Sequence, residues 1–272
     1  SEASLEKTRQ LSNMALALSR DVLHGMEHFR VVVQPIVFSR TGGIGGGEVL
    51  LRWQFEGQDI SPAVFIPLLE KNNMIHLAGR WVFEQAVCSC LRLHSYNPDF
   101  YLSFNVSLQQ MSDEQFPDFM DQMLTKYGLT GDRLVAEVTE SCMDEEPEKL
   151  LRFVRMCGEK GIRIALDDFG SGYSSFRMLL QYPSDIIKLD RSLLQEMIES
   201  DEKSNFISSV VYACHRFGKK VCMEGVETAE QHLLIRDAGC DMIQGFYCYR
   251  PMELDQLYSL LASQCPPEAP QT

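Results

Sequence analysis

The sequence predicts an α/β protein, a TIM-like (β/α)8 barrel whose first strand is antiparallel to the others. Eight short apolar segments alternate with longer amphipathic segments, which is typical of strands followed by helices. The chain has 272 residues, and barrels of about 250 residues form single domains. The loop between the first two strands is too short for a parallel crossover, which needs a dozen or more residues. An open doubly wound sheet is the alternative.

The expected elements follow in chain order. The strand candidates are short and apolar, and they span residues 29–37, 47–53, 101–107, 134–141, 162–169, 186–190, 220–227 and 242–249. The helix candidates lie between them, at residues 62–72, 76–95, 113–127, 147–160, 173–180, 202–217, 229–238 and 254–263. Pro62 after Ser61, and Thr228 before the helix candidate 229–238, are helix-start signals.

A glycine-rich stretch at residues 42–47 separates the first two strands. It resembles a phosphate-binding loop, but neither a Lys-Ser/Thr pair nor a helix follows it. A hairpin turn is the better interpretation, and it makes the first strand antiparallel to the second.

We divide the chain into three parts. Residues 1–14 are expected to form a helical leader from an upstream linker, because apolar residues recur there at helical spacing. Residues 15–263 form the barrel. Residues 264–272 form a disordered tail, because three prolines prevent a helix from continuing.

The charge balance restricts the partners. Acidic residues outnumber basic ones by 38 to 25, for a net charge of −13, which argues against binding to a DNA or RNA polymer. A small phosphate ligand is still compatible with this charge, because metal ions reverse the sign of a site locally. No apolar run approaches the roughly 18 residues of a membrane helix, and the odd number of cysteines, nine, indicates reduced thiols. We expect a cytoplasmic fragment without membrane contact, although the full-length protein can carry an anchor upstream.

Polar residues recur near the ends of the predicted strands, inside apolar surroundings. They are Glu48, Asn105, Glu137, Asp167, Asp168, Lys188, Asp190, Glu224 and Gln244. The carboxyl ends of parallel strands meet on one face of a barrel, so these side chains are expected to converge there. Carboxylates brought together repel one another and need a cation, and oxygen ligands suit Mg²⁺ or Mn²⁺. Two adjacent aspartates can bridge two ions about 4 Å apart, as in phosphoester cleavage. Scattered salt-bridging acids are the alternative.

Eight motifs in order and spacing make the chain similar to the EAL domain family over roughly residues 15–260. They are QPI at 34–36, EVLLRW at 48–53, FNVS at 104–107, EVTES at 137–141, DDFGSGYSS at 167–175, IKLDRS at 187–192, EGVET at 224–228 and QG at 244–245. The resemblance implies a metal-dependent bacterial phosphodiesterase that hydrolyses cyclic di-GMP to linear 5′-pGpG in second-messenger signalling.

The resemblance also implies the roles of individual residues. Glu48, Asn105, Glu137 and Asp167 resemble ligands of one metal ion. Asp168, Glu224 and Asp190 resemble the surroundings of a second ion, with Asp167 bridging. Lys188 and Glu224 are the catalytic candidates: Lys188 orients or activates the attacking water, and the proton acceptor is left open between Glu224 and an aspartate.

Four further roles follow from the same resemblance. Arg52 resembles the phosphate contact, and Gln34 and Gln244 resemble substrate contacts. Glu140 resembles the anchor of the loop at 169–175, which neighbours the face of an expected homodimer. An upstream regulatory or cyclase domain is expected by the same analogy.

The chain departs from the family pattern at four places near these motifs, and one of them, Ser171 in place of Thr, keeps the hydroxyl. Val49 stands where the family has alanine, and we expect it to face the helices, because side chains on a strand alternate. Val33 and Met223 are expected near the site, where they would weaken substrate affinity. No departure removes a metal ligand, which favours an active enzyme over a silent cyclic di-GMP receptor or a protein-interaction module.

Overall fold

The computed structural model describes residues 2–139, 141–170, 179, 182–198 and 201–264. Its strands are β1 (Phe29–Phe38), β2 (Ile44–Phe55), β3 (Gln58–Ile60), β4 (Tyr101–Asn105), β5 (Leu134–Thr139), β6 (Arg163–Phe169), β7 (Ile186–Leu189), β8 (Lys220–Met223), β9 (Met242–Ile243) and β10 (Met252–Glu253). Its helices are α1 (Glu2–Leu23), α2 (Pro62–Lys71), α3 (Ile75–Leu93), α4 (Phe116–Tyr127), α5 (Ser141–Glu145), α6 (Pro147–Glu159), α8 (Arg191–Ile198), α9 (Asp201–Arg216), α10 (Ala229–Asp237) and α11 (Leu254–Gln264), with 3₁₀ turns at Gln110–Ser112 and Gly131–Arg133.

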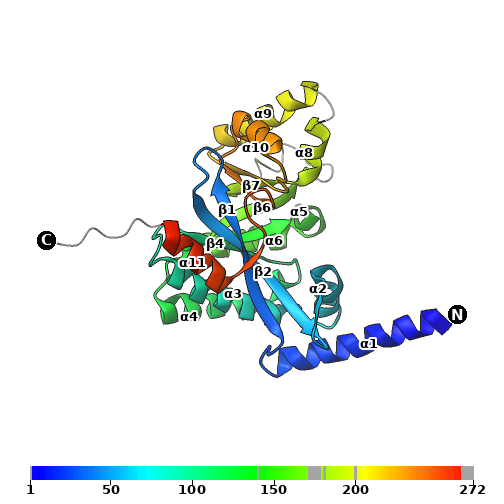
Figure 1. The fold of residues 1–272 in the computed structure, drawn as a ribbon. Helices are drawn as coiled ribbons and strands as arrows, with labels where there is room; N and C mark the ends of the chain where they lie inside the picture. Colours follow the sequence, from blue (N-terminus) through cyan, green and yellow to red (C-terminus); the bar gives the residue numbers. More distant parts are fainter. Residues whose placement is uncertain (1, 140, 171–178, 180–181, 199–200, 265–272) are drawn as a thin grey trace.

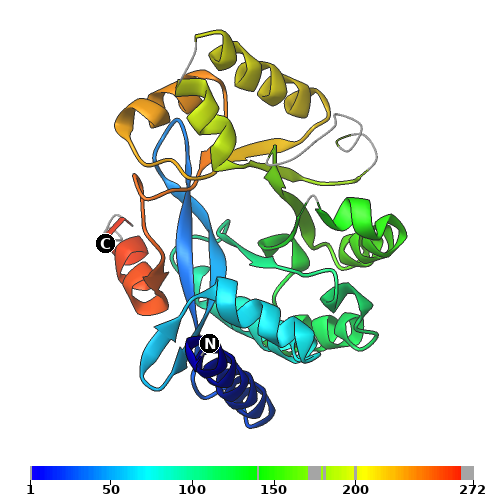
Figure 2. The same ribbon diagram turned by 90° about the vertical axis from the view of Figure 1, so that its right-hand side faces the viewer.

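Eight of the strands close into a barrel. The ring runs β1-β9-β8-β7-β6-β5-β4-β2 and returns to β1, while β3 and β10 extend it at the side. The helices surround this ring, as the turned view shows (Figure 2). The predicted (β/α)8 barrel is confirmed, and the open-sheet alternative is wrong.

The first strand runs against its neighbours, as predicted. β1 pairs antiparallel with both β2 and β9, whereas the other neighbours within the ring pair in parallel. The glycine-rich stretch is the turn of the β1–β2 hairpin, where the backbone N–H of Phe38 donates to the carbonyl of Gly43 at 2.9 Å. The phosphate-loop alternative is therefore wrong.

Side-chain alternation divides the inside of the barrel into two layers. The lower layer, toward the amino ends of the parallel strands, is an apolar cluster of Ile36, Tyr101, Val135, Ala165, Ile186, Cys222 and Met242. Two residues further toward the carboxyl ends stand polar residues, among them Gln34, Glu137, Asp167, Lys188, Glu224 and Gln244. Because the strand period is two, each polar residue shares the inward face with the apolar residue below it.

The main core lies between the strands and the helices. Val49 is buried there with Val82 and Phe83 of α3, so the expectation that it faces the helices is confirmed. A second cluster joins α1 to the β1–β2 hairpin through Leu18 and Trp53, whose indole N–H donates to Asp21 at 3.0 Å. The first turns of α1 project away from the barrel (Figure 1).

The strands after β6 end earlier than predicted. β8 ends at Met223 and β9 at Ile243, because the chain leaves the ring there to build the mouth of the barrel. The sequence also gave no sign of α8, β3 or β10. The helix candidate at 173–180 lies almost wholly outside the described residues, as does the tail from 265.

Two smaller expectations concern the cysteines and the membrane. The eight cysteines among the described residues are all free thiols, as predicted. Across the part of the chain that the structure describes, none of the helices is both long and apolar enough to cross a membrane.

Candidate active site

Lys188 stands at the centre of the polar layer, buried on β7. Its ammonium group faces four carboxylates from different parts of the ring: Glu137 at 2.6 Å, Glu224 at 2.7 Å, Glu48 at 3.2 Å and Asp167 at 3.5 Å. One ammonium group therefore meets four acids, and the cluster carries an excess of formal negative charge. Such an excess inside a protein requires either protons or added cations.

The surrounding charges set the protonation of this cluster. Burial alone would lower the pKa of Lys188, but the opposing charges of Glu137, Glu48 and Glu224 raise it well above its usual value. Lys188 is therefore a fixed ammonium ion. Burial raises the pKa of Glu224 to about 7, although Lys188 opposes the shift.

The two glutamates on β2 and β5 respond in opposite directions. Burial would raise the pKa of Glu48, but Lys188 and the amides of Gln244 and Asn105 lower it. Glu137 accepts no hydrogen bond from an amide side chain of the described residues, and burial together with the charge of Glu48 raises its pKa well above the usual range. The surroundings therefore favour the ionised form of Glu48 and disfavour that of Glu137.

An irregularity in β6 brings two consecutive aspartates to one side. On a regular strand, Asp167 and Asp168 would point to opposite faces. The pairing register shifts between Leu166 and Phe169, and Asp168 adopts a left-handed conformation with φ of 57°. The backbone N–H of Asp168 then donates to the carboxylate of Asp167 at 2.9 Å. This bulge directs both side chains into the mouth of the barrel.

The carboxylates near the bulge fit a hard divalent cation. Asp167, Asp168 and Glu224 each offer one oxygen, and these oxygens lie within 4.8 Å of one another. Burial and the neighbouring charges of Asp167 and Asp190 raise the pKa of Asp168, so the group is short of positive charge. Oxygen-only ligands and surplus negative charge are what Mg²⁺ and Mn²⁺ require.

The remaining predicted metal ligands lie close by in different settings. Glu48 accepts a hydrogen bond from Asn105 at 2.8 Å, and both belong with Glu137 to the side of the mouth around β2, β4 and β5. Asp190 accepts a hydrogen bond from the backbone N–H of Ser192 at 2.9 Å, so one of its oxygens caps the start of α8. The structure thus brings every described member of the predicted set to one end of the barrel.

The two glutamines form a chain of amides behind Glu48. Gln244 donates to Glu48 at 2.6 Å and to the side-chain oxygen of Gln34 at 3.2 Å, and Gln34 donates to the carbonyl of Tyr249 at 3.1 Å. The side-chain oxygen of Gln244 is buried and accepts no hydrogen bond from the described residues. In this arrangement both glutamines orient Glu48.

Two cavities flank the acidic cluster. One, of about 330 Å³, is lined by Glu48, Glu224, Arg191 and Phe246. The other, of about 300 Å³, is lined by Arg52, Asn105 and apolar residues of α2 and α3. Arg52 is partly buried and donates to the carbonyl of Leu51 at 2.9 Å.

Sequence reasoning missed two residues of the first cavity. Phe246 is 48% exposed, and the guanidinium of Arg250 lies 4.2 Å from the centre of its ring. Arg191 lines the same cavity. The available signal was the position of Phe246 directly after the QG motif and of Arg191 inside the IKLDRS motif.

The expected effect of Val33 and Met223 needs correction. Both side chains are fully buried in the core between strands and helices, while their neighbours Gln34 and Cys222 face the inside of the barrel. The prediction that they lie at the site is wrong, because it took proximity in sequence for a shared face. Glu140 lies outside the described residues, as does most of the loop at 169–175.

The fold and the site together define a TIM-like barrel with a cluster of carboxylates at its mouth. A family model described as the EAL domain matches residues 16–251. The chain therefore belongs to the EAL domain family, and the resemblance stated from the motifs is confirmed.

Known relatives cover most of this chain. The bifunctional diguanylate cyclase/cyclic di-GMP phosphodiesterase MucR of Pseudomonas aeruginosa is 32% identical over 252 residues, which are 91% of this chain and 37% of MucR. The cyclic di-GMP phosphodiesterase RocR of the same organism is 31% identical over 247 residues, which are 90% of this chain and 63% of RocR. A solved structure of the PaMucR phosphodiesterase in complex with c-di-GMP superposes with a TM-score of 0.81 at 31% identity, covering 90% of this chain and 99% of that one. The chain thus spans less than two thirds of these full-length relatives.

Proposed function

We propose that this chain hydrolyses cyclic di-GMP to linear 5′-pGpG with two Mg²⁺ or Mn²⁺ ions. The observation that carries the proposal is Lys188, an ammonium ion held by four carboxylates beside an oxygen-only cluster. Phosphodiester hydrolysis in related proteins such as RocR, which is named for this activity, supports the choice of substrate.

The proposal assigns the cations to the two sides of the mouth. Asp167, Asp168, Glu224 and Asp190 would hold one ion, and Glu48, Asn105 and Glu137 would hold the other together with Asp167. When bound, such ions lower the pKa of a water molecule and offset the charge on the reacting phosphate.

The protein groups supply positive charge and a proton acceptor. The ammonium group of Lys188 cannot accept a proton, so it orients the attacking water and stabilises the negative charge that develops on the phosphate. Burial raises the pKa of Glu224 to about 7 in the metal-free chain, and Glu224 or one of the aspartates at the mouth would accept the proton of the attacking water.

The two flanking cavities suit the two halves of the substrate. Cyclic di-GMP carries a guanine on either side of its phosphate ring. One base would lie against the exposed ring of Phe246, and the other in the cavity beside Arg52, whose guanidinium would contact a phosphate. Gln34 and Gln244 would act mainly by orienting Glu48.

The setting of the activity is part of the same proposal. We place the chain in the cytoplasm as one part of a longer signalling protein, because MucR and RocR are longer than this chain. The same proposal includes an upstream regulatory or cyclase domain and a homodimer next to the loop at 169–175. It includes no binding to a DNA or RNA polymer.

Product analysis tests the proposal. The purified chain is incubated with cyclic di-GMP and Mg²⁺ or Mn²⁺, and the products are identified by chromatography and mass spectrometry. We expect 5′-pGpG that disappears with EDTA and falls at least a thousandfold in Asp167→Asn. Asp118→Asn, an exposed change of the same type on α4, is the matched control and keeps full turnover.

Two other outcomes would contradict the proposal. Micromolar binding of cyclic di-GMP without any product would make the domain a receptor. Neither binding nor turnover in the presence of metal would leave an interaction module.

A further inference from the structure

A second cavity lies at the opposite end of the barrel from the acidic mouth. It has a volume of about 710 Å³ and is lined by residues at the beginnings of the parallel strands and in the β1–β2 turn. Arg163 begins β6, whereas Asp167 lies near the carboxyl end of the same strand. The cavity is therefore separated from the mouth by the apolar lower layer of the barrel, and its size is that of a small-molecule site.

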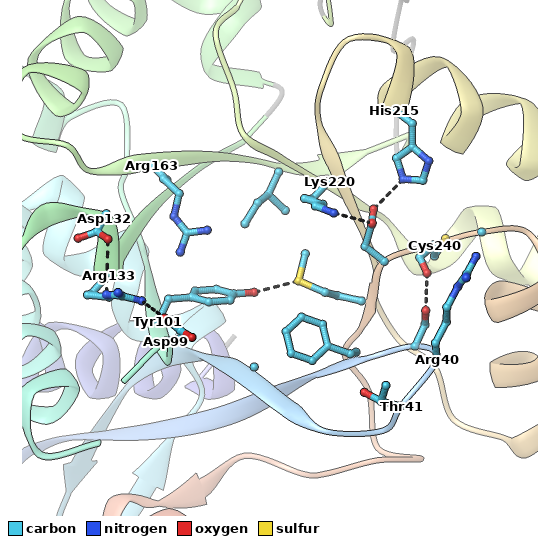
Figure 3. Close-up of a pocket in the computed structure, with 17 residues that line it drawn as sticks. Arg40, Thr41, Asp99, Tyr101, Asp132, Arg133, Arg163, His215, Lys220 and Cys240 are labelled. Carbon is cyan, nitrogen blue, oxygen red and sulfur yellow. Dashed lines mark hydrogen bonds and ion pairs between the residues drawn. The ribbon is translucent and has the colours of Figure 1, made fainter. Parts of the chain in front are cut away.

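Basic groups exceed acidic groups in this cavity. Its basic side chains are Arg40, Arg133, Arg163 and Lys220, and its acidic side chains are Asp99, Asp132 and Asp241. His215 also lines the cavity (Figure 3). The whole chain has a net charge of −13. A net positive cavity in so acidic a protein is a local feature that attracts anions.

Each of the three acids of the cavity is paired with Arg133, Lys220 or His215. Asp99 and Asp132 pair with Arg133 at 3.1 Å and 3.5 Å. Asp241 pairs with Lys220 at 3.2 Å and with His215 at 2.8 Å. Arg40 and Arg163 form no ion pair with any residue that the structure describes, so their charges are available to a ligand.

Arg163 is incompletely hydrogen-bonded among the described residues. Its Nε is buried and has no hydrogen-bond partner among the described residues. Its guanidinium lies 4.8 Å from the centre of the Tyr101 ring and points into the cavity (Figure 3). A buried donor without a partner destabilises the fold, and an anion bound in the cavity would satisfy it.

The walls of the cavity offer flat apolar surface. The ring of Tyr101 forms part of the floor, together with Ile186 and Met242. Phe38 is 46% exposed, and its ring lies against the backbone of β2, since a Cβ on Gly45 would come within 2.5 Å of it. Aromatic rings in the lining of a cavity, beside a guanidinium that forms no ion pair with the described residues, suit a planar molecule that carries a negative charge.

We propose that this cavity binds an organic anion in which a phosphate or carboxylate is attached to a flat apolar group. The anionic group lies on Arg163, with Arg40 adding positive charge at the edge, and the flat group lies against Phe38 and Tyr101. The site is independent of the acidic mouth and of the proposed hydrolysis.

Calorimetric titration with defined probes tests this site. The probes are 1-naphthyl phosphate and 1-naphthoate, compared with inorganic phosphate and neutral 1-naphthalenemethanol, all in EDTA so that no metal occupies the mouth. At least one naphthyl anion is expected to bind ten times more tightly than either inorganic phosphate or the neutral alcohol. Preference for the phosphate or for the carboxylate identifies the anionic group.

Three variants locate the binding. Arg163→Met keeps the length of the side chain and is expected to weaken binding at least tenfold. Arg155→Met, an exposed arginine on α6, removes the same charge elsewhere and leaves the affinity unchanged. Glu48→Gln alters the mouth and also leaves it unchanged. If Arg163→Met does not fold, Arg40→Gln on the exposed turn decides, with an expected loss of about threefold.

Several results would overturn the proposal. Equal affinity for inorganic phosphate and the naphthyl anions means an adventitious ion only. Affinity that survives both arginine variants, or that is lost in Glu48→Gln, puts the probe elsewhere. The absence of binding by both naphthyl anions at 10 mM removes the site.

Discussion

The two ends of this barrel differ in how they treat charge, although the same strands build both. On β6, Arg163, Ala165 and Asp167 share one inward face. At the carboxyl end, Asp167 belongs to a cluster in which four acids face Lys188. At the amino end, about 13 Å away at the usual rise of a strand, Arg163 keeps a buried donor that no described residue satisfies.

The difference shows that the fold fixes positions and leaves the sign of charge free. The apolar layer between the ends, including Tyr101 and Val135, separates two environments of opposite charge. The mouth is held together by opposite charges and is still short of cations. The opposite end, at the amino ends of the parallel strands, is here called the base of the barrel. It is held together mainly by packing, and its cavity carries an excess of positive charge. Each end can therefore be altered by a change that has little effect at the other.

Removal of the central ammonium should have the largest effect on stability. In Lys188→Met, the acids around it lose the one buried ammonium group that faces them among the described residues, so we expect the metal-free chain to lose about 3–5 kcal/mol of unfolding free energy. Mg²⁺ should recover part of this loss, because a cation replaces the missing charge. Urea unfolding in EDTA measures the loss of unfolding free energy, and urea unfolding in Mg²⁺ measures how much of it the cation restores.

The matched control for this change is Lys71→Met at the exposed end of α2, which should cost less than about 0.5 kcal/mol. Similar losses in the two variants would mean that the acids at the mouth are not held by Lys188, and the contrast between the two ends would fail.

Packing at the base gives the next largest effect. A Cβ on Gly46 would lie 2.5 Å from the ring of Tyr101, so Gly46→Ala should cost about 1–3 kcal/mol through overpacking. This loss should be the same in EDTA and in Mg²⁺, unlike that of Lys188→Met. Gly43→Ala, whose Cβ would meet nothing closer than 3.5 Å, is the control. A metal-dependent loss in Gly46→Ala would show that the two ends are coupled.

The cation affinity of the mouth should depend on pH. Burial raises the pKa of Glu224 to about 7, so below pH 7 a proton occupies the carboxylate that the ion needs. Metal binding displaces this proton, and the affinity for Mg²⁺ should rise by up to tenfold per pH unit between pH 6 and 7 and level off above pH 8. Titrations in buffers with different heats of ionisation measure the released proton directly. A flat affinity from pH 6 to 8 would contradict the assignment of Glu224 as a ligand.

Much of this architecture could be predicted because it depends on local patterns. The alternation of apolar strands and helices gave the barrel, and the length of the glycine-rich loop gave the antiparallel β1. The convergence of Glu48, Glu137 and Lys188 followed from the rule that strand ends meet on one face. Each of these inferences needs only the order and the period of the residues.

The parts that failed depend on departures from a regular period or on distant contacts. The bulge at Asp168 reverses the alternation of β6, and no composition rule marks it. Val33 and Met223 were misplaced because adjacent residues on a strand face opposite sides. The cavity around Arg163 joins residues of seven strands and of the loops before them, so no single segment of sequence could reveal it.

The smallest expected effect distinguishes the unpaired arginine from the buried lysine. Arg163→Met removes a cation–π contact worth about 0.5–1 kcal/mol. It also removes a buried donor that has no partner among the described residues, and such a donor destabilises the parent chain by about 1–3 kcal/mol. The two terms oppose each other, so the unfolding free energy should stay within about 1 kcal/mol of the parent chain or rise slightly. Urea unfolding without added anions measures it. A loss above 2 kcal/mol would mean that Arg163 holds the barrel together, and the base would then resemble the mouth in depending on its central cation.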